Sequence, residues 1–257
     1  MSLHTRTWRG AVFGAAVIVL SACQTTSTKT PETEPLDGVQ RTLFQAGRDS
    51  ELAHKYEAAA GAYGRLSEMR PNDPAVLASF LRNMRYSGRA RDVLKYLDDK
   101  PQELLSDKDV QFEQAKAYLA AGKKNEALMI LRTVQEKLPG DWRVYSALGI
   151  TLDALALYDD AQFNYQKALA ISPNNEVVLN NLAMSLAMTG KLKAAIEALE
   201  TAAGVNRNNQ QIRQNLALLY AINGQVDRAK TLAAMDLDAG DLETNMSFYR
   251  RFERSPQ

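Results

Sequence analysis

The sequence predicts an all-α protein, a solenoid in which helix–turn–helix repeats stack into a right-handed superhelix. Three observations lead to this prediction. One pattern of apolar and small residues returns every 34 residues, for example from Trp142 to Glu176. The alternation of apolar and polar residues that marks half-buried strands is absent. Apolar residues make up 46 % of the chain but aromatic residues only 7 %, which suits helices that pack through small contacts.

The unit that begins at Trp142 shows the pattern most clearly. Its positions 4, 7, 8 and 11 share one face of a first helix, and its positions 20, 24 and 27 share one face of a second. Small residues at positions 8 and 20 let the two helices cross closely, and a proline at position 32 ends the second helix. These positions hold, in order, Tyr145, Leu148, Gly149, Leu152, Ala161, Tyr165, Ala168 and Pro173.

The same spacing continues along the chain without an insertion. Units begin near residues 40, 74, 108, 142, 176 and 210; the first is worn, and the last loses the pattern toward its end. Spacing and residues resemble the tetratricopeptide repeat. The resemblance implies about six repeats over residues 39–243, with a first helix over positions 1–14 and a second over positions 18–31 of each. A capping helix and tail over residues 241–257 are expected to cover the apolar face of the last repeat.

Position 15 of each unit is predicted to leave the first helix with a positive φ, which glycine adopts most easily. His54 and Ala156 hold this position in the first and fourth units, so we expect less regular turns there. The other four units have Gly88, Gly122, Gly190 and Gly224. The aspartates that precede first helices are expected to cap them, and they are Asp73, Asp107 and Asp141.

Residues 1–22 resemble a bacterial lipoprotein signal peptide. Arg6 and Arg9 precede an apolar run over residues 10–20, and the small residues that follow lead to Cys23. The run is shorter than the ~20 residues that a membrane-spanning helix needs. The sequence Leu-Ser-Ala-Cys resembles a lipobox, which implies cleavage before Cys23 and lipidation of that cysteine. An ordinary cleaved signal with an incidental cysteine is the alternative.

The lipid would anchor the mature chain to a membrane, because several acyl chains together bind a bilayer durably. Gln24 follows the cysteine where an aspartate would mark inner-membrane retention, so the outer membrane is favoured. We therefore expect a protein at the periplasmic face of the outer membrane of a Gram-negative bacterium. Residues 23–38, the lipidated cysteine and a segment rich in Thr, Ser, Pro and Glu, are predicted to be a flexible linker.

The charge balance and the motifs argue against catalysis and against nucleic acid. The 31 lysines and arginines nearly equal the 30 acidic residues, so no basic excess favours nucleic acid. The two histidines and one cysteine do not have metal-ligand spacing, and no phosphate loop or hydrolase motif is present. Asp159 and Asp160 are interpreted as partners of a helix N-terminus. We expect no enzyme activity, no cofactor, no metal and no small-molecule substrate.

The first helices are predicted to supply a binding surface for a protein partner. Their positions 2, 5, 9, 12 and 13 should line the concave face, basic toward the N-terminal end and apolar with amides toward the C-terminal end. Amides suit the backbone of an extended peptide, and methionines adapt to its side chains. For Met184 and Leu218, packing against neighbouring helices is an equal alternative. The candidate residues are Arg82, Arg85, Phe112, Lys116, Ser146, Ile150, Asp153, Asn180, Met184, Met188, Gln214, Leu218 and Ile222.

Four segments give a narrower resemblance. Residues 141–143, 178–185, 212–218 and 245–250, together with the lipobox, are similar to the TadD family of repeat-containing lipoproteins. That family belongs to the Tad machinery, which assembles Flp (type IVb) pili. The resemblance implies a scaffold at the outer membrane whose partners are the Tad secretin or other pilus assembly components, and which assists secretin assembly or localisation.

Two other classes of function remain open from the sequence. One is a generic envelope adaptor that recruits proteases or cell-wall enzymes through its repeats. The other is a cell-wall enzyme, which would need an acid or a nucleophile in a cleft. Trp142 likewise has two interpretations, packing at a repeat junction or contact with a partner.

Overall fold

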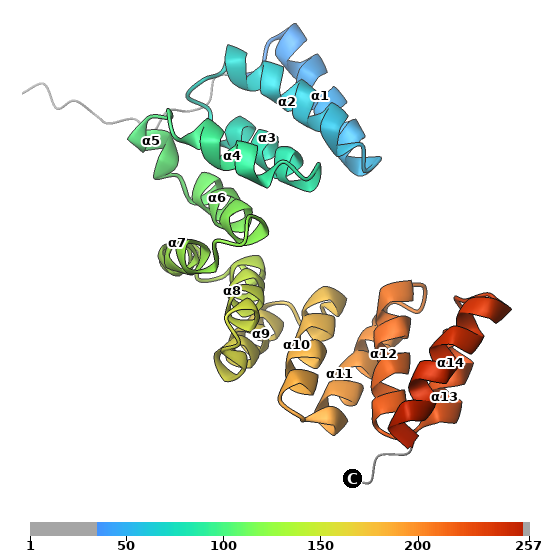
Figure 1. Ribbon diagram of the computed structural model, residues 1–257. Coiled ribbons are helices and arrows are strands. Elements are labelled where there is room, and N and C mark those ends of the chain that lie inside the picture. The colour runs from blue at the N-terminus through green and yellow to red at the C-terminus, as the bar shows by residue number, and fades with distance from the viewer. Residues whose placement is uncertain (1–34, 254–257) are drawn as a thin grey trace, which may run out of the picture. The chain divides into compact units, whose positions relative to one another are not determined.

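The computed structural model describes residues 35–253, and helices joined by short turns make up this range (Figure 1). The chain divides into two units, Met1–Pro35 and Leu36–Gln257, and every described helix lies in the second. The predicted signal peptide, Cys23 and most of the predicted linker lie outside the described residues. Of the helices in residues 35–253, none combines the length and apolar character that crossing a bilayer requires.

Each repeat consists of two antiparallel helices, called here the A helix and the B helix. The A helices are α1 (Gly38–Leu52), α3 (Pro74–Tyr86), α6 (Lys108–Ala120), α8 (Trp142–Ala154), α10 (Glu176–Met188) and α12 (Gln210–Ile222). The B helices are α2 (Tyr56–Met69), α4 (Ala90–Leu97), α7 (Lys124–Lys137), α9 (Tyr158–Ile171), α11 (Leu192–Val205) and α13 (Val226–Ala233). A short helix, α5 (Gln102–Leu105), follows α4, and α14 (Ala239–Glu253) follows α13.

The period predicted from the sequence determines where the helices begin. From α3 onward the A helices begin at residues 74, 108, 142, 176 and 210, and the B helices begin at residues 56, 90, 124, 158, 192 and 226. The B helices therefore start at position 17 of each unit, one residue earlier than expected. The prediction of an all-α repeat solenoid is confirmed for the described residues.

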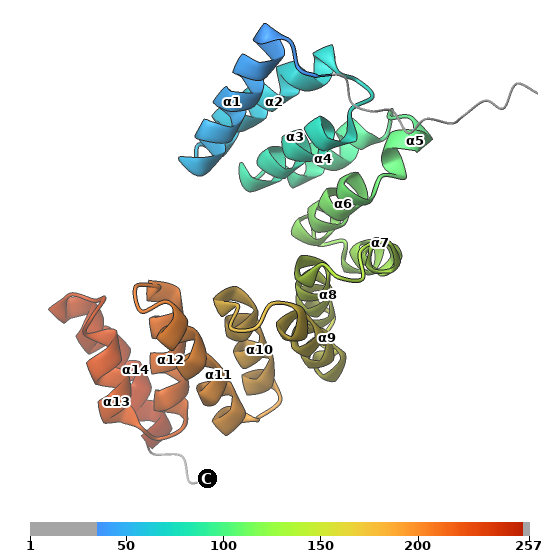
Figure 2. The ribbon, with the colours of Figure 1, turned by 180° about the vertical axis from the view of Figure 1, so that it is seen from behind.

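The repeats stack in chain order. Within each pair the A helix packs on its own B helix, and each B helix also packs on the A helix that follows, for example α7 on α8 and α9 on α10. Successive A helices from α3 to α12 contact one another as well. Figures 1 and 2 show the helix pairs following one another in chain order. A continuous row of A helices therefore runs along the stack, and residues from neighbouring repeats meet on it.

Position 8 of the A helix lies close to position 24 of the B helix in two of the repeats. A Cβ atom added to Gly149 would lie 2.5 Å from the ring of Tyr165, and one added to Gly47 would lie 2.9 Å from the ring of Tyr63. Both tyrosines are buried. In these two repeats the tyrosine ring occupies the space that a side chain at the glycine position would need.

Other repeats fill the same crossing with a different pair of residues. Ala115 and Leu131 lie in one buried cluster, and Ala183 and Leu199 lie together in another. All four side chains are fully buried. In these two repeats, alanine in place of glycine on the A helix is matched by leucine in place of tyrosine on the B helix, which keeps the crossing closely packed.

The A helices begin at capping residues. Asp73, Asp107 and Asp141 each accept a hydrogen bond from a backbone N–H in the first turn of the following helix, which confirms the expectation. Asn175 and Asn209 do the same for α10 and α12. These caps fix the residue at which each A helix starts.

The turns between A and B helices are more regular than the sequence suggested. Gly88, Gly122, Gly190 and Gly224 have φ values between 75° and 82°. His54 and Ala156, at the same position of their repeats, have φ values of 55° and 59°. The expectation of less regular turns was wrong, because these two residues adopt the left-handed conformation despite its steric cost.

The second and sixth B helices are shorter than the sequence suggested, because α4 ends at Leu97 and α13 at Ala233. Pro101 explains the first case, since proline lacks the N–H that a helix needs and disfavours helical conformation in the residue before it. The helix α5 follows directly after this proline. In the last repeat, α14 packs on α12 and α13 and buries Met246 and Tyr249.

Two departures from the repeat pattern in the last unit compensate each other. Arg213 replaces the large residue at position 4, and Asp236 replaces the small residue at position 27. The Nε of Arg213 donates to Oδ2 of Asp236 at 2.9 Å, and the two side chains form an ion pair that is 14 % and 5 % exposed. The Arg213 guanidinium lowers the pKa of the Asp236 carboxyl. The charges that break the pattern are therefore satisfied by each other.

Gly149→Leu is expected to lower the free energy of unfolding by about 1–3 kcal/mol, because overpacking a close crossing forces neighbouring atoms to move. Chemical denaturation followed by circular dichroism measures the loss. The control is Gly140→Leu, at an exposed turn where an added Cβ would meet no atom within 4 Å. Equal stability of the Gly149 variant and the wild type would contradict the crossing described here.

Substitutions at position 15 are expected to change the stability of the protein in opposite directions, depending on whether the native residue is glycine or alanine. Ala156→Gly should stabilise the protein and Gly122→Ala should destabilise it, each by about 1 kcal/mol, because only glycine adopts this positive φ without strain. Gly61→Ala is the matched control, at an exposed site inside α2 without a positive φ, and should stabilise by about 0.5–1 kcal/mol. The melting temperatures of the three variants test these expectations. If Gly122→Ala and Gly61→Ala shifted the melting temperature in the same direction, the role of the positive φ would be refuted.

Candidate functional site

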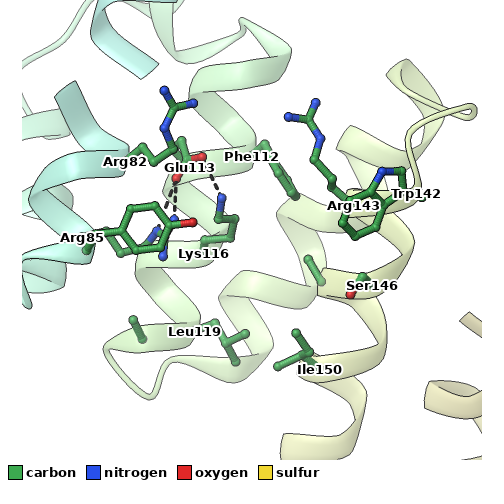
Figure 3. A pocket seen from close by; sticks show the side chains of 13 residues that line it. Arg82, Arg85, Phe112, Glu113, Lys116, Leu119, Trp142, Arg143, Ser146 and Ile150 are labelled. Carbon is green, nitrogen blue, oxygen red and sulfur yellow. Dashed lines mark hydrogen bonds and ion pairs between the residues drawn. The ribbon is translucent and has the colours of Figure 1, made fainter. Parts of the chain in front are cut away.

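A cavity of about 500 Å³ lies where three successive A helices, α3, α6 and α8, come together (Figure 3). Six of the thirteen residues that line it were predicted as partner-binding residues from the sequence: Arg82, Arg85, Phe112, Lys116, Ser146 and Ile150. The other lining residues are Tyr86, Glu113, Leu119, Ala120, Trp142, Arg143 and Ala147. The 34-residue period brings these side chains together from three repeats.

One end of the pocket is a charged cluster centred on Glu113. Arg85 donates from Nε and Nη2 to Oε2 of Glu113 at 3.3 and 3.2 Å, and Lys116 donates from Nζ to Oε1 at 2.7 Å. Glu113 is only 5 % exposed, so both of its oxygens are used inside the protein. This carboxylate joins α3 to α6 and holds the two cations in place.

The other end of the pocket is apolar. Phe112 is buried at its wall, Ile150 is 40 % exposed, and Leu119 and Trp142 are half-buried. The close-up shows Leu119 and Ile150 on the side of the pocket away from Arg82 (Figure 3). Small residues from α8 leave the space open between these walls. The apolar surface and the charged cluster together give the pocket two chemically different ends.

Phe112 marks the place where the two ends meet. The Nζ of Lys116 lies 4.5 Å from the centre of its ring, and the guanidinium carbon of Arg143 lies 6.0 Å from it. Cations at this range are attracted to the face of an aromatic ring. Burial lowers the pKa of Lys116, and the positive charges of Arg85 and Arg82 act in the same direction against the opposing effect of Glu113.

The expected basic character of this end of the A-helix row is reduced by ion pairs. Arg82 donates from Nε and Nη2 to the two oxygens of Glu51 at 2.7 and 3.2 Å. Arg143 donates from Nε to Asp141 at 2.9 Å and lowers the pKa of that carboxyl. The four cations of the pocket therefore share three carboxylates, of which only that of Glu113 lines the pocket.

Sequence reasoning did not select four charged or aromatic residues of the pocket wall as site residues: Tyr86, Glu113, Trp142 and Arg143. For Trp142, contact with a partner was one of two interpretations. Arg143 occupies position 2, which the repeat pattern already directs inward. Glu113 stands three residues before Lys116 on the same helix, a spacing that favours an ion pair. Both signals were present, but the contact between Glu113 and Arg85 joins different repeats and has no local signature.

Asp153 is a bridge between repeats and does not line the pocket. Tyr165 donates from its hydroxyl to Oδ2 of Asp153 at 2.8 Å, and Ser185 donates from Oγ to Oδ1 at 2.6 Å. Burial raises the pKa of Asp153, and the two hydrogen bonds oppose this shift. Its carboxylate therefore ties α8 to α9 and α10, and both of its oxygens are occupied.

The predicted row of free amides in the C-terminal repeats is not present. Asn180 is 8 % exposed, and its Oδ1 accepts a hydrogen bond from Nδ2 of Asn215 at 2.7 Å. Gln214 donates from Nε2 to Asp236 at 3.2 Å. These amides serve contacts within the protein, which removes the reason for assigning them to a peptide backbone.

The apolar candidates of the C-terminal repeats differ from one another. Leu218 and Ile222 pack against the buried cluster formed by the last repeats, so the packing alternative applies to Leu218. Met184 is half-buried, and Met188 is 65 % exposed. None of these four lines the pocket between α3, α6 and α8. Within residues 35–253 no group of histidine, cysteine and acidic side chains is arranged to hold a metal ion.

Comparison with known proteins gives two kinds of match. Family models described as tetratricopeptide repeat match residues 143–175 and 164–197. An uncharacterized protein of Sinorhizobium fredii, y4yS, is 35 % identical over 83 residues, which are 32 % of this chain and 46 % of that protein. The match thus spans about half the length of this relative.

Solved structures share the fold at low sequence identity. A tetratricopeptide repeat protein from Parabacteroides merdae has a TM-score of 0.60 at 15 % identity, over 84 % of this chain and 88 % of that one. MamA from Desulfovibrio magneticus has a TM-score of 0.54 at 15 % identity, over 72 % and 98 %. A thermophilic repeat protein from Thermus thermophilus has a TM-score of 0.52 at 18 % identity, over 82 % and 99 %.

These findings agree with the helix order and the 34-residue period. The matched models cover the fourth repeat and most of the fifth, and the solved structures cover the stack more widely. Residues 143–197 are therefore similar to tetratricopeptide repeats, and the stack shares the fold of these solved repeat proteins.

Proposed function

We propose that this chain is a non-enzymatic scaffold that binds a protein partner in the pocket between α3, α6 and α8. One observation supports this most directly: side chains from three successive repeats line a single open pocket with an apolar end and a charged end. Binding sites commonly combine an apolar surface with a few charged or polar groups that fix orientation. Two side chains of the wall, Trp142 and Arg143, belong to the residue types that dominate binding energy at protein interfaces.

The scaffold is proposed to act at the outer membrane, anchored by a lipid on Cys23. The signal-peptide pattern of residues 1–22 and the lipobox support this placement. The resemblance to TadD lipoproteins supports a partner within the Tad machinery, the secretin or another pilus assembly component. In this role the pocket holds an assembly component while the lipid keeps the complex at the membrane.

A generic envelope adaptor is the second candidate, and one observation favours it. The asparagine-containing segments that resemble TadD lie in α10 and α12, where Asn180 and Asn215 hydrogen-bond to each other. Packing between successive A helices accounts for these amides without a pilus partner. In this alternative the same pocket recruits proteases or cell-wall enzymes.

Photo-crosslinking in living cells tests the binding surface. A photoreactive amino acid at Ile150, on the exposed wall of the pocket, is expected to capture a protein partner. The control is Met129 on α7, which is 67 % exposed and does not line the pocket. Mass spectrometry of the product separates the candidates: a secretin or pilus component supports the first, and a protease or cell-wall enzyme supports the second. Equal capture at both positions, or none at Ile150, would refute the pocket as the working surface.

Cys23→Ser is expected to release the protein from membranes while the folded repeats stay intact, because the lipid is the proposed anchor. Fractionation of outer and inner membranes, with circular dichroism of the purified variant, measures both effects. If the variant remained fully in the outer-membrane fraction, lipidation of Cys23 would not be what holds the protein there.

A further inference from the structure

The pocket between α3, α6 and α8 has an electrostatic asymmetry that its own ion pairs do not remove. Four cations line it, and Glu113 is the single anion among the thirteen lining residues. Glu113 serves Arg85 and Lys116 at once, so one negative charge is divided between two positive ones. Glu51 and Asp141, which pair with Arg82 and Arg143, do not line the pocket. When these two carboxylates are counted as well, four cations stand against three anions, so a ligand inside the pocket meets a net excess of one positive charge.

The cationic and the apolar groups are close enough for one short segment to reach both. Lys116 lies with its Nζ 4.5 Å from the centre of the Phe112 ring, and Arg143 approaches the same ring. Side chains on one side of an extended peptide are about 6.6–6.8 Å apart, two residues along the chain. An acidic side chain and a large apolar side chain with this spacing would match the two ends.

On these grounds we infer that the pocket binds a protein segment in which an aspartate or glutamate stands within about two residues of a large apolar side chain. This inference rests on the proposed function and adds the chemistry of the ligand. The acidic group faces Arg85, Lys116 and Arg143, and the apolar group packs between Ile150, Phe112 and Trp142. A basic segment is disfavoured, because the one carboxylate of the pocket wall is already engaged by two cations.

The first step of the test selects peptides from a random dodecapeptide display library on the full-length protein in detergent. Enriched peptides are expected to contain an acidic residue within two positions of Phe, Trp, Leu, Ile or Met. The tightest peptide is then made with a fluorescent label, together with a version in which its acidic residues are replaced by the matching amides. Fluorescence polarisation measures both, and the amide version is expected to bind at least about ten-fold more weakly.

Three variants then locate the binding site. Ile150→Glu and Arg143→Glu, both at side chains with ample exposure, should each weaken the acidic peptide at least about ten-fold by adding negative charge to the pocket. Glu113→Gln keeps the shape but removes the competing anion, and should strengthen binding by about three- to ten-fold. Met129→Glu, outside the pocket, is the matched control and should leave the affinity unchanged.

Thermal denaturation checks that each variant is folded, and Arg143→Glu decides the outcome if Glu113→Gln is not. The inference would be overturned if the library yielded basic or uncharged peptides, or no binding peptide at all. It would also be overturned if the amide version bound as tightly as the acidic peptide, or if the pocket variants bound that peptide as tightly as the wild type. If the peptide-binding test failed but crosslinking at Ile150 captured a partner, the proposed function would stand and the ligand would have a different chemistry. If crosslinking at Ile150 failed but the acidic peptide bound as expected, the proposed role in the cell would be rejected instead.

Discussion

The structure depends on how closely two helices cross within each repeat. Gly149 against Tyr165, Gly47 against Tyr63, and the alanine–leucine pairs of other repeats solve the same packing problem with different volumes. The crossing sets the position of the A helix relative to its B helix, and the B helix then supports the next A helix. Side chains at equivalent positions of α3, α6 and α8 meet in one pocket because this geometry is repeated.

Features with a local or periodic signature were predictable from the sequence, whereas contacts between repeats were not. The starts of the A helices from α3 onward, the caps at Asp73 and Asp107 and the positive φ of the turn glycines depend on a few neighbouring residues, and the structure agrees with each. Six pocket residues followed from the period. The period places a residue on a face but does not name its partner, so the engagement of Asn180 by Asn215 had no signal within either helix.

Polar contacts divide the row of A helices into two kinds of surface. In the C-terminal repeats, Asp153 and Asn180 direct their polar atoms to neighbouring helices, and Gln214 donates to Asp236 in the turn after α13, so these groups contribute to cohesion of the stack. In the N-terminal repeats the ion pairs of Glu113 and Glu51 join helices too, yet they leave a cavity with apolar walls between them. The pocket proposed to bind a partner therefore lies where ion pairs join the A helices and leave the space between them unfilled.

The ion pair of the last repeat has a consequence for how this protein can change its sequence. Restoring a large apolar residue in place of Arg213 would remove the cation that pairs with the Asp236 carboxylate, and restoring a small residue in place of Asp236 would remove the anion that pairs with the guanidinium. Each change toward the repeat consensus is thus unfavourable alone, although both together would recreate the usual pair. The two positions are epistatic, and a consensus design applied one residue at a time would fail at this repeat.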